Sequence, residues 1–288
     1  ADEPIPFDAR GCQGEEELPS WLVRLRSPRR NGGVLYLVGT DHLSKMSQEH
    51  AVQAIRTVKP KFVMLELCKK RKQMLANCGS SYSRSRDNGC TVCQSLCQLS
   101  LSGNVSVAIL GFLLSRFMQR VGDDLKTTSG LEFKAAAREA RKQRASLILG
   151  DRDFTVTVRR IWGALSVLDR TMLCFELFLG AYFGIRWTGR VRTADESFLR
   201  LGSRFPAIIR PLIRERDQYM AHVLRYFVDQ GECVVAVVGQ AHVKGICEQW
   251  EKNINVRRLL DVPQSSPLRM FMILLTFFLF VFYLVGSF

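Results

Sequence analysis

The chain has 288 residues, a formal net charge of +14 and 47% hydrophobic residues. This length supports one large α/β domain or two small ones, each with ample core. The basic residues are spread over several segments and lack interleaved stacking aromatics, so no nucleic-acid partner is predicted. The nine cysteines are scattered along the chain, which favours free thiols in a reducing compartment.

The first folded segment is predicted to be a β-hairpin. Residues 1–20 are expected to be disordered. Residues 21–25 alternate between apolar and other side chains, and a turn rich in Pro and Gly leads into an apolar run at residues 34–38. A helix is expected to follow, from a cap at Ser44 or Ser47 to Val58, and Pro60 ends it.

A Gly-x-x-His motif closes two similar apolar runs. Residues 34–38 are followed by Gly39 and His42, and residues 234–238 by Gly239 and His242. An apolar run without polar interruption is typical of a strand buried on both faces in a parallel sheet. The carboxyl edge of such a sheet is where ligands bind. Two equivalent strands would bring both histidines to one metal ion; alternatively, each histidine caps its strand by bonding to backbone carbonyls.

Glu66 interrupts another strand-like segment, residues 61–68. A carboxylate is unfavourable in a dry sheet unless it is paired or bound to a cation. A strand-helix-strand connection is expected to place Glu66 beside the strand of His42, so we predict that Glu66 belongs to the same site. The alternative is a strand-end glutamate that reaches solvent or Arg71.

Two further charged motifs are candidates for the same edge. Asp151 and Arg152 end a third strand-like segment, residues 146–152, where they either pair with each other or face the cleft of His42 and Glu66. The triplet 215–217 lies in a helical stretch, residues 206–227, and either supports the site or decorates a surface.

The remaining segments have weaker signals. Residues 78–106 are predicted to be a variable loop, because structural zinc sites usually need four ligands and Cys90, Cys93 and Cys97 supply three. Helices are expected at residues 107–117, after a cap at Thr128 or Ser129, and at residues 155–168. Residues 172–187 suit a core or membrane-surface helix. A short closing strand is expected at residues 255–262, before a linker at residues 263–269.

The last segment, residues 270–288, contains no charged residue. Its length is close to the roughly 20 residues that cross a bilayer as a helix. Arg257, Arg258 and Arg269 precede it, and positive residues stay cytosolic, so we expect a tail anchor with the folded domain in the cytosol. The alternatives are a buried C-terminal helix and a hairpin-like insertion.

These residue types suit metal-assisted hydrolysis. Neutral imidazole and carboxylate bind divalent metals such as zinc, manganese or cobalt, which activate water for attack on an ester or amide. We predict His42, His242 and Glu66 as ligands, with Glu66 also able to act as a general base. Arg152 or Arg216 would hold an anionic substrate or stabilise an oxyanion. Gly39, Asp151 and Gly239 are predicted to support the site.

The ordered set of motifs resembles the TraB domain family, which includes bacterial pheromone-shutdown proteins and, more distantly, the Tiki proteases. The resemblance rests on residues 38–42, 63–68, 130–133, 149–152, 215–217 and 238–242. It implies an α/β fold for residues 21–262, with a central, mostly parallel sheet flanked by helices and a helical insertion. It also implies a metal site formed by the two motifs and the strand glutamate. The chain departs from the family pattern at Asp41, which would either add a ligand or displace one, and at Ala241 and Asp153.

The resemblance implies two alternative functions. The first is a membrane-anchored, metal-dependent hydrolase that acts on peptides or proteins. The second is a non-catalytic adaptor at the mitochondrial outer membrane, at contacts with the endoplasmic reticulum or in organelle turnover. The short apolar span suits the mitochondrial outer membrane first and the endoplasmic reticulum second.

Overall fold

A computed structural model describes residues 19, 21–29, 32–40, 45–75, 105–124, 130–183 and 200–262. The chain divides into two compact units. The sheet unit comprises residues 1–78, 128–153 and 213–259, and the helical unit comprises residues 79–127, 154–212 and 260–288.

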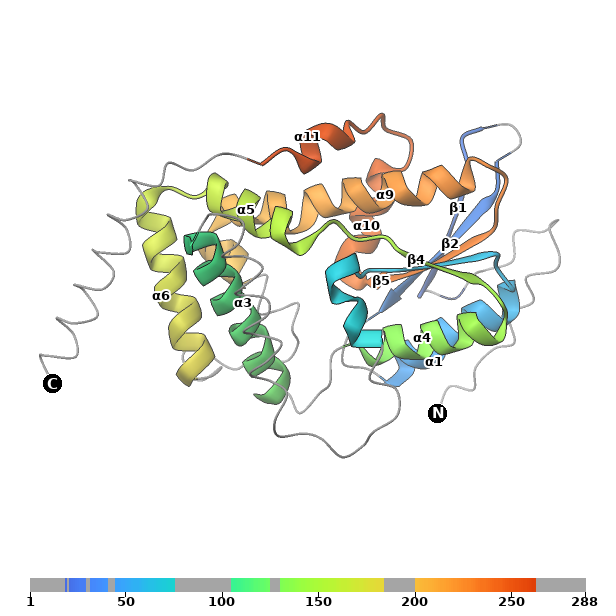
Figure 1. Cartoon of the computed structure of the whole chain (residues 1–288). Helices are drawn as coiled ribbons and strands as arrows, with labels where there is room; N and C mark the ends of the chain where they lie inside the picture. The colour runs from blue at the N-terminus through green and yellow to red at the C-terminus, as the bar shows by residue number, and fades with distance from the viewer. Residues whose placement is uncertain are drawn as a thin grey trace, which may run out of the picture. The chain divides into compact units, whose positions relative to one another are not determined.

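The sheet unit contains a five-stranded sheet (Figure 1). Its strands lie in the order β1-β2-β5-β3-β4, and β2, β5, β3 and β4 are parallel to their neighbours. Only β1 is antiparallel, paired with β2 as the predicted hairpin. The strands are β1 (Leu22–Arg26), β2 (Val34–Thr40), β3 (Phe62–Leu65), β4 (Ser146–Leu149) and β5 (Val234–Gly239). The prediction of a mostly parallel sheet is therefore confirmed.

The strand order corrects one expectation from the sequence. We expected Glu66 beside the strand of His42, but β5 lies between β2 and β3. The strands of the two Gly-x-x-His motifs are direct neighbours, with Thr40 opposite Gly239. Leu65 pairs with Val237 on the other side of β5. Glu66 therefore follows the strand next to that of His242.

Both faces of the sheet are covered by helices, as Figure 1 shows. Helices α1 (Lys45–Val58) and α4 (Leu131–Lys142) pack on one face, with Val235 and Val237 in that core. Helices α9 (Glu215–Val228) and α10 (Gln240–Gln249) pack on the other, with Val234, Ala236 and Val238. Since every residue of β5 is buried, this double coverage explains why the strand sequence is apolar without alternation.

The helical unit is built around three longer helices. Helix α3 (Val105–Asp124) packs against α5 (Phe154–Ala164) and α6 (Val167–Phe183). The helix predicted at residues 155–168 ends earlier, at Ala164. The side chain of Ser166 accepts a hydrogen bond from the backbone N–H of Asp169 (3.1 Å), and this cap starts α6 as a separate helix. Helix α8 (Pro206–Ile209) also contacts α5.

The closing segment differs from its prediction. Residues 255–262 were expected to form a strand, but the segment contains the helix α11 (Val256–Leu260). Asn255 Oδ1 accepts a hydrogen bond from the backbone N–H of Arg258 (3.2 Å). An asparagine in this position favours a helix start over a strand, so the strand prediction was wrong. Two short helical segments, η1 (Lys69–Leu75) and η2 (Arg210–Arg214), also belong to the described residues.

Several predicted segments lie outside the described residues. They include residues 1–18, the three cysteines of the 78–106 loop, the linker 263–269 and the predicted transmembrane segment 270–288. Within the part of the chain that the structure describes, none of the helices combines the length and apolar character that a membrane span requires.

Candidate functional site

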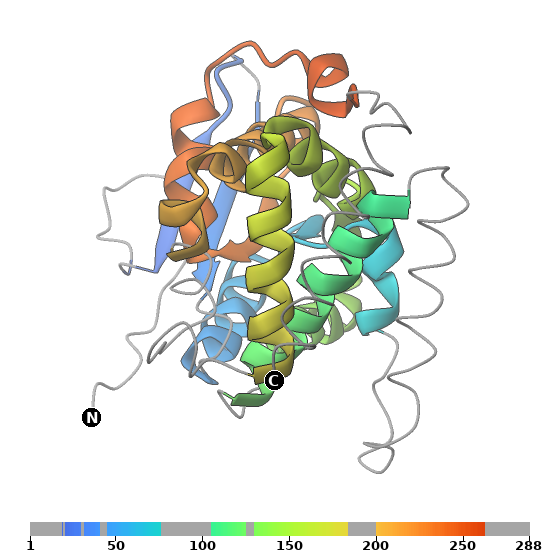
Figure 2. The same cartoon turned by 90° about the vertical axis from the view of Figure 1, so that its left-hand side faces the viewer.

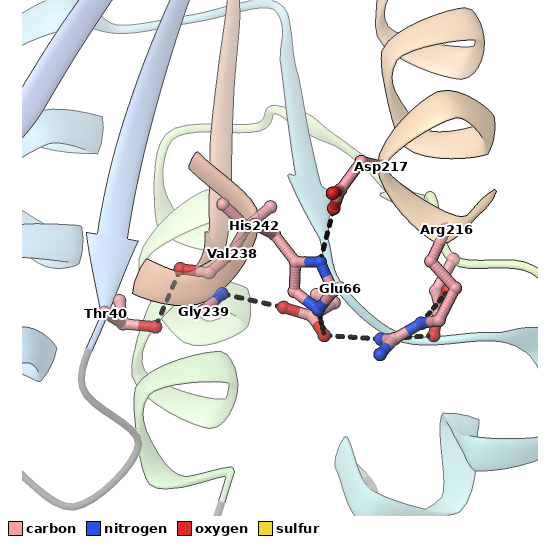
Figure 3. A network of polar contacts seen from close by, with 8 residues as sticks. Thr40, Glu66, Arg216, Asp217, Val238, Gly239 and His242 are labelled. Atoms are coloured by element: carbon pink, nitrogen blue, oxygen red, sulfur yellow. Dashed lines mark hydrogen bonds and ion pairs between the residues drawn. The ribbon is translucent and has the colours of Figure 1, made fainter. Parts of the chain in front are cut away.

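A buried polar cluster lies at the carboxyl edge of the sheet (Figure 3). Glu66 follows β3 directly, and His242 lies in the first turn of α10, which continues from β5. Arg216 and Asp217 come from the first turn of α9. Asp151 follows β4 and joins the cluster through Arg216. Four separate segments of the sheet unit thus bring charged side chains to one place.

Glu66 is the centre of this cluster. Its Oε2 accepts a hydrogen bond from the backbone N–H of Gly239 (2.7 Å). Its Oε1 accepts one from Arg216 Nη2 (2.5 Å) and lies 3.1 Å from His242 Nε2. The carboxylate is only 7% exposed. The partners that a buried carboxylate needs are therefore supplied by the end of β5, by α10 and by α9.

His242 is held between two carboxylates. Its Nδ1 lies 2.5 Å from Asp217 Oδ1, on the opposite side of the ring from Glu66. Asp217 is itself 3% exposed. A carboxylate on one ring nitrogen fixes the orientation of an imidazole and leaves the other nitrogen directed at the site. Here the other nitrogen, Nε2, is directed at Glu66.

Two pairs of adjacent residues, 151–152 and 215–216, form ion pairs with each other at the edge of the cluster. Arg216 forms a two-pronged contact with Asp151, from Nε to Oδ1 (3.0 Å) and from Nη2 to Oδ2 (2.9 Å). Arg152 Nη1 donates instead to Glu215 Oε2 (3.0 Å) and to the carbonyl of Leu259 (2.9 Å). Asp151 and Arg152 therefore do not pair with each other. Asp151 joins the Glu66 cluster, whereas Arg152 is fully buried beside Glu215.

Among the described residues, the cluster contains more carboxylates than permanent cations. The carboxylates of Glu66, Asp151 and Asp217 lie around one arginine, Arg216, which contacts Glu66 and Asp151. Burial of His242 disfavours its charged form, but Glu66 and Asp217 outweigh this effect and raise the pKa of His242 to about 9. Burial raises the pKa of Asp217, opposed by its contact with His242. Near neutral pH the cluster therefore holds a proton on His242.

Arg216 is the permanent cation of the cluster. Burial works against its charged form, but Asp151 and Glu66 more than compensate and hold the pKa of Arg216 above its usual range. Its guanidinium links the residue after β3 to the residue after β4. Of the two arginines predicted to serve the site, Arg216 contacts Glu66, whereas Arg152 contacts Glu215 and the carbonyl of Leu259.

The two glycines predicted to support the site act differently. A Cβ on Gly39 would lie 1.9 Å from Gln240 Oε1, so the end of β2 accommodates the side chain that follows β5. Gly239 has φ −60° and ψ 144°, which any residue can adopt. Its contribution is the backbone N–H that binds Glu66. His42 and Asp41 lie outside the described residues, so their part in the site stays a prediction.

Comparison with known proteins supports the resemblance in the motifs. The sequence is 29% identical to the human TraB domain-containing protein over 269 residues, covering 86% of this chain and 70% of the human protein. Its identity to the bovine protein is 29% over 256 residues (82% and 67%), and to the mouse protein 28% over 269 residues (86% and 70%). The chain belongs to the TraB domain family. No family model matches the sequence.

Two of the three proposed metal ligands, His242 and Glu66, are among the described residues of this cluster. Within the described residues, no group of three or more His, Cys, Asp or Glu side chains is arranged to hold a metal ion. The third proposed ligand, His42, would follow β2, whose last residue Thr40 pairs with Gly239 at the same edge.

The triplet 215–217 was predicted either to support the site or to lie on a surface, and Arg216 was its only predicted site residue. A signal for Asp217 was present. The apolar stripe of α9 contains Met220, Leu224 and Val228, and Asp217 lies three residues before its first member. Helical periodicity therefore places Asp217 on the buried face, where a carboxylate needs a partner. Glu215 has no comparable signal in the sequence.

Gly245 makes room for Asp217. A Cβ on Gly245 would lie 2.0 Å from Asp217 Oδ2 and 2.5 Å from its Cγ. Although alanine is the better helix former, Gly245→Ala is expected to lower the free energy of unfolding by about 1–3 kcal/mol, because it overpacks this site. It should also shift the titration of His242, which NMR of the imidazole would measure.

A matched control for Gly245→Ala is Lys244→Ala. Lys244 is exposed on the same helix and makes a long contact of 3.9 Å with Glu248, which contributes little to stability. Equal unfolding energies and equal His242 titration in both variants would show that Gly245 does not position Asp217.

Proposed function

We propose that this TraB-family protein is a metal-dependent hydrolase whose substrates are peptides or proteins. The observation that carries the proposal is the negative cluster around His242, in which three carboxylates face one arginine. A buried cluster of this kind attracts a proton or a cation. Its position at the carboxyl edge of a mostly parallel sheet is where α/β proteins bind ligands.

The donor set is compatible with a divalent metal. Asp217 orients His242 through Nδ1, as carboxylates commonly do for metal-binding histidines, and Nε2 faces a carboxylate oxygen. The proposed ligands are His242, Glu66 and His42, and the metal is zinc, manganese or cobalt. When bound, such a metal would supply Lewis acidity and a nucleophilic water for hydrolysis.

The residues of the chain have separate tasks in this proposal. Asp217 holds the ring of His242, and Gly239 and Arg216 hold the two oxygens of Glu66. Glu66 is placed to accept a proton as a general base. Arg216 would stabilise negative charge that develops on a substrate. Arg152 was also predicted to bind an anion. Its contacts with Glu215 and Leu259 instead favour a role for Arg152 in holding α9 in position.

A second candidate is a non-catalytic adaptor, and one observation favours it. Both oxygens of Glu66 and both ring nitrogens of His242 already have partners within the protein. The cluster is therefore complete as a structural unit without a ligand. In this alternative, it stabilises a domain that binds partners at organelle contacts or in organelle turnover.

In both proposals, residues 270–288 anchor the chain in a membrane, with the sheet unit in the cytosol. The support is the uncharged run of residues that follows Arg269. The mitochondrial outer membrane is the first proposed location and the endoplasmic reticulum the second. Microscopy of the tagged chain with organelle markers tests both, and alkaline extraction of membranes tests the anchor.

The metal content of the purified full chain tests the hydrolase proposal. After incubation with zinc, manganese or cobalt, elemental analysis is expected to find about one metal per chain. His42→Ala and His242→Ala should each lose it, because each removes one proposed ligand. His222→Ala is the matched control, since His222 is exposed on α9.

A folded wild-type chain that stays free of metal would contradict the hydrolase proposal, and so would equal metal content in all three histidine variants. Circular dichroism identifies any variant that fails to fold. For the adaptor alternative, localisation and partner capture are compared between the wild type and a triple variant with alanine at His42, Glu66 and His242. Unchanged capture by a triple variant that circular dichroism shows to be folded favours the adaptor.

A further inference from the structure

Helix α6 presents apolar side chains on two opposite sides. On one side, Leu173 and Leu177 are 2% and 1% exposed. Helix α6 packs against α3, as Figure 2 shows with α6 in yellow at the front and α3 in green beside it. Gly180 admits the ring of Phe117 on this side, because a Cβ there would lie 2.7 Å from a ring carbon. This side of α6 belongs to the core of the helical unit.

The other side of α6 carries a row of apolar side chains that are accessible to solvent. Leu168 is 68% exposed, Met172 43% and Tyr182 52%, and Leu179 is half-buried. At about 100° per residue these four positions lie within about 80° of one another around the helix, opposite Leu177. We call Leu168, Met172, Leu179 and Tyr182 the α6 stripe.

The acidic residues beside the α6 stripe are already paired within the helical unit. Asp169 accepts a hydrogen bond from the hydroxyl of Ser166 (2.6 Å), and Glu176 pairs with Arg204. The described residues of this unit include eight arginines and five acidic residues. The whole chain carries a charge of +14. An apolar stripe in a cationic setting suits the headgroup region of an anionic bilayer.

A second copy of the chain suits the α6 stripe less well. Its spacing would fit the seam of a two-helix coiled coil, in which charged residues beside the seam select the partner. The flanking positions hold Asp169, Thr171, Glu176 and Phe178. None of them is basic, and Arg204 already pairs with Glu176, so two α6 helices would meet without charged pairs that select a partner. The charges therefore favour a lipid surface over self-association.

We propose that the α6 stripe is a membrane-contact surface that inserts into the headgroup region of a bilayer containing anionic lipids. It holds the helical unit against that surface. The inference deepens the proposed membrane attachment and rests on it for the choice of membrane. The contact itself uses residues of α6 alone, so it can be measured without the anchor.

The test uses the full chain with its anchor disabled by Leu275→Asp and Leu279→Asp. Flotation is measured with vesicles of phosphatidylcholine alone and of phosphatidylcholine with phosphatidylserine. The anchor-disabled chain is expected to bind the vesicles that contain phosphatidylserine. Adding Leu168→Glu and Met172→Glu should weaken this binding about tenfold or more, because two apolar side chains are lost and two negative charges are added.

A matched control places the same two changes elsewhere. Leu131 and Tyr226 are also exposed apolar residues, at 39% and 63%, and Leu131→Glu with Tyr226→Glu adds the same charge to the sheet unit. This control should bind as the anchor-disabled chain does. Equal weakening by both pairs of substitutions would mean that only net charge matters and would overturn the proposal.

Two other outcomes would also overturn it. One is no vesicle binding by the anchor-disabled chain. The other is a dimer in light scattering that Leu168→Glu and Met172→Glu convert to a monomer, which would assign the α6 stripe to a second copy. Alkaline extraction of the wild-type chain reports on residues 270–288 separately, so failure of the anchor and failure of the α6 stripe can be distinguished.

Discussion

Arg152→Met is expected to lower the free energy of unfolding by about 3–5 kcal/mol, because it removes a buried cation that contacts the buried carboxylate of Glu215. Arg152 is fully buried, and its Nη1 donates to Glu215 Oε2 and to the carbonyl of Leu259. The substitution removes both contacts and keeps most of the side-chain volume. Urea unfolding followed by circular dichroism measures the loss.

A double-mutant cycle isolates the charge effect. Glu215→Leu combined with Arg152→Met removes both charges, so the double variant is expected to be more stable than Arg152→Met alone. The carbonyl of Leu259 loses its Arg152 donor in both variants. A double variant no more stable than the single one would show that packing, and not the buried charge, accounts for the destabilisation.

The stability of the protein is expected to fall as the pH rises from about 6.5 to about 9. Glu66 and Asp217 overcome the effect of burial and raise the pKa of His242 from 6.5 to about 9 in the folded state. A group with a raised folded-state pKa contributes stability that is complete below its unfolded-state pKa and is lost as the pH passes the folded-state pKa. The loss is roughly 3 kcal/mol for a shift of this size.

His242→Gln identifies the source of this pH dependence. Buried thiols contribute in the same direction, since burial raises the pKa of Cys174 to about 12 and also raises that of Cys247. Both thiols are present in the variant, so the difference between the two pH profiles belongs to His242. Metal-free protein is used for both profiles. Parallel profiles for wild type and His242→Gln would refute the assignment of the raised pKa to His242.

The sequence could predict the strands of the site because their signals are local. Residues 34–38 and 234–238 are apolar without interruption, and β2 and β5 are indeed parallel neighbours inside the sheet. Glu66 stood out because a carboxylate is unfavourable in such a run. The structure places it just past β3, where the backbone N–H of Gly239 binds it.

The partners of these residues could not be predicted in the same way. Every interior strand of a parallel sheet is apolar on both faces, so the pattern does not say which strand lies next to which. That is why Glu66 was expected beside β2 and was found beside β5. The closing helix α11 was also missed, because a five-residue segment is too short for its periodicity to separate helix from strand.

From the sequence, Glu66 and His242 were predicted to share a site at the carboxyl edge of the sheet, and Asp151 and Arg216 were candidates for the same site. Their pairing is visible only in the folded chain, where Arg216 contacts Asp151 and Glu66, Arg152 contacts Glu215, and Asp217 contacts His242. The strands that carry Glu66 and His242 have local signals, whereas an ion pair depends on the distance between two side chains. That distance is set by strand order and helix placement, which depend on contacts between residues far apart in the sequence.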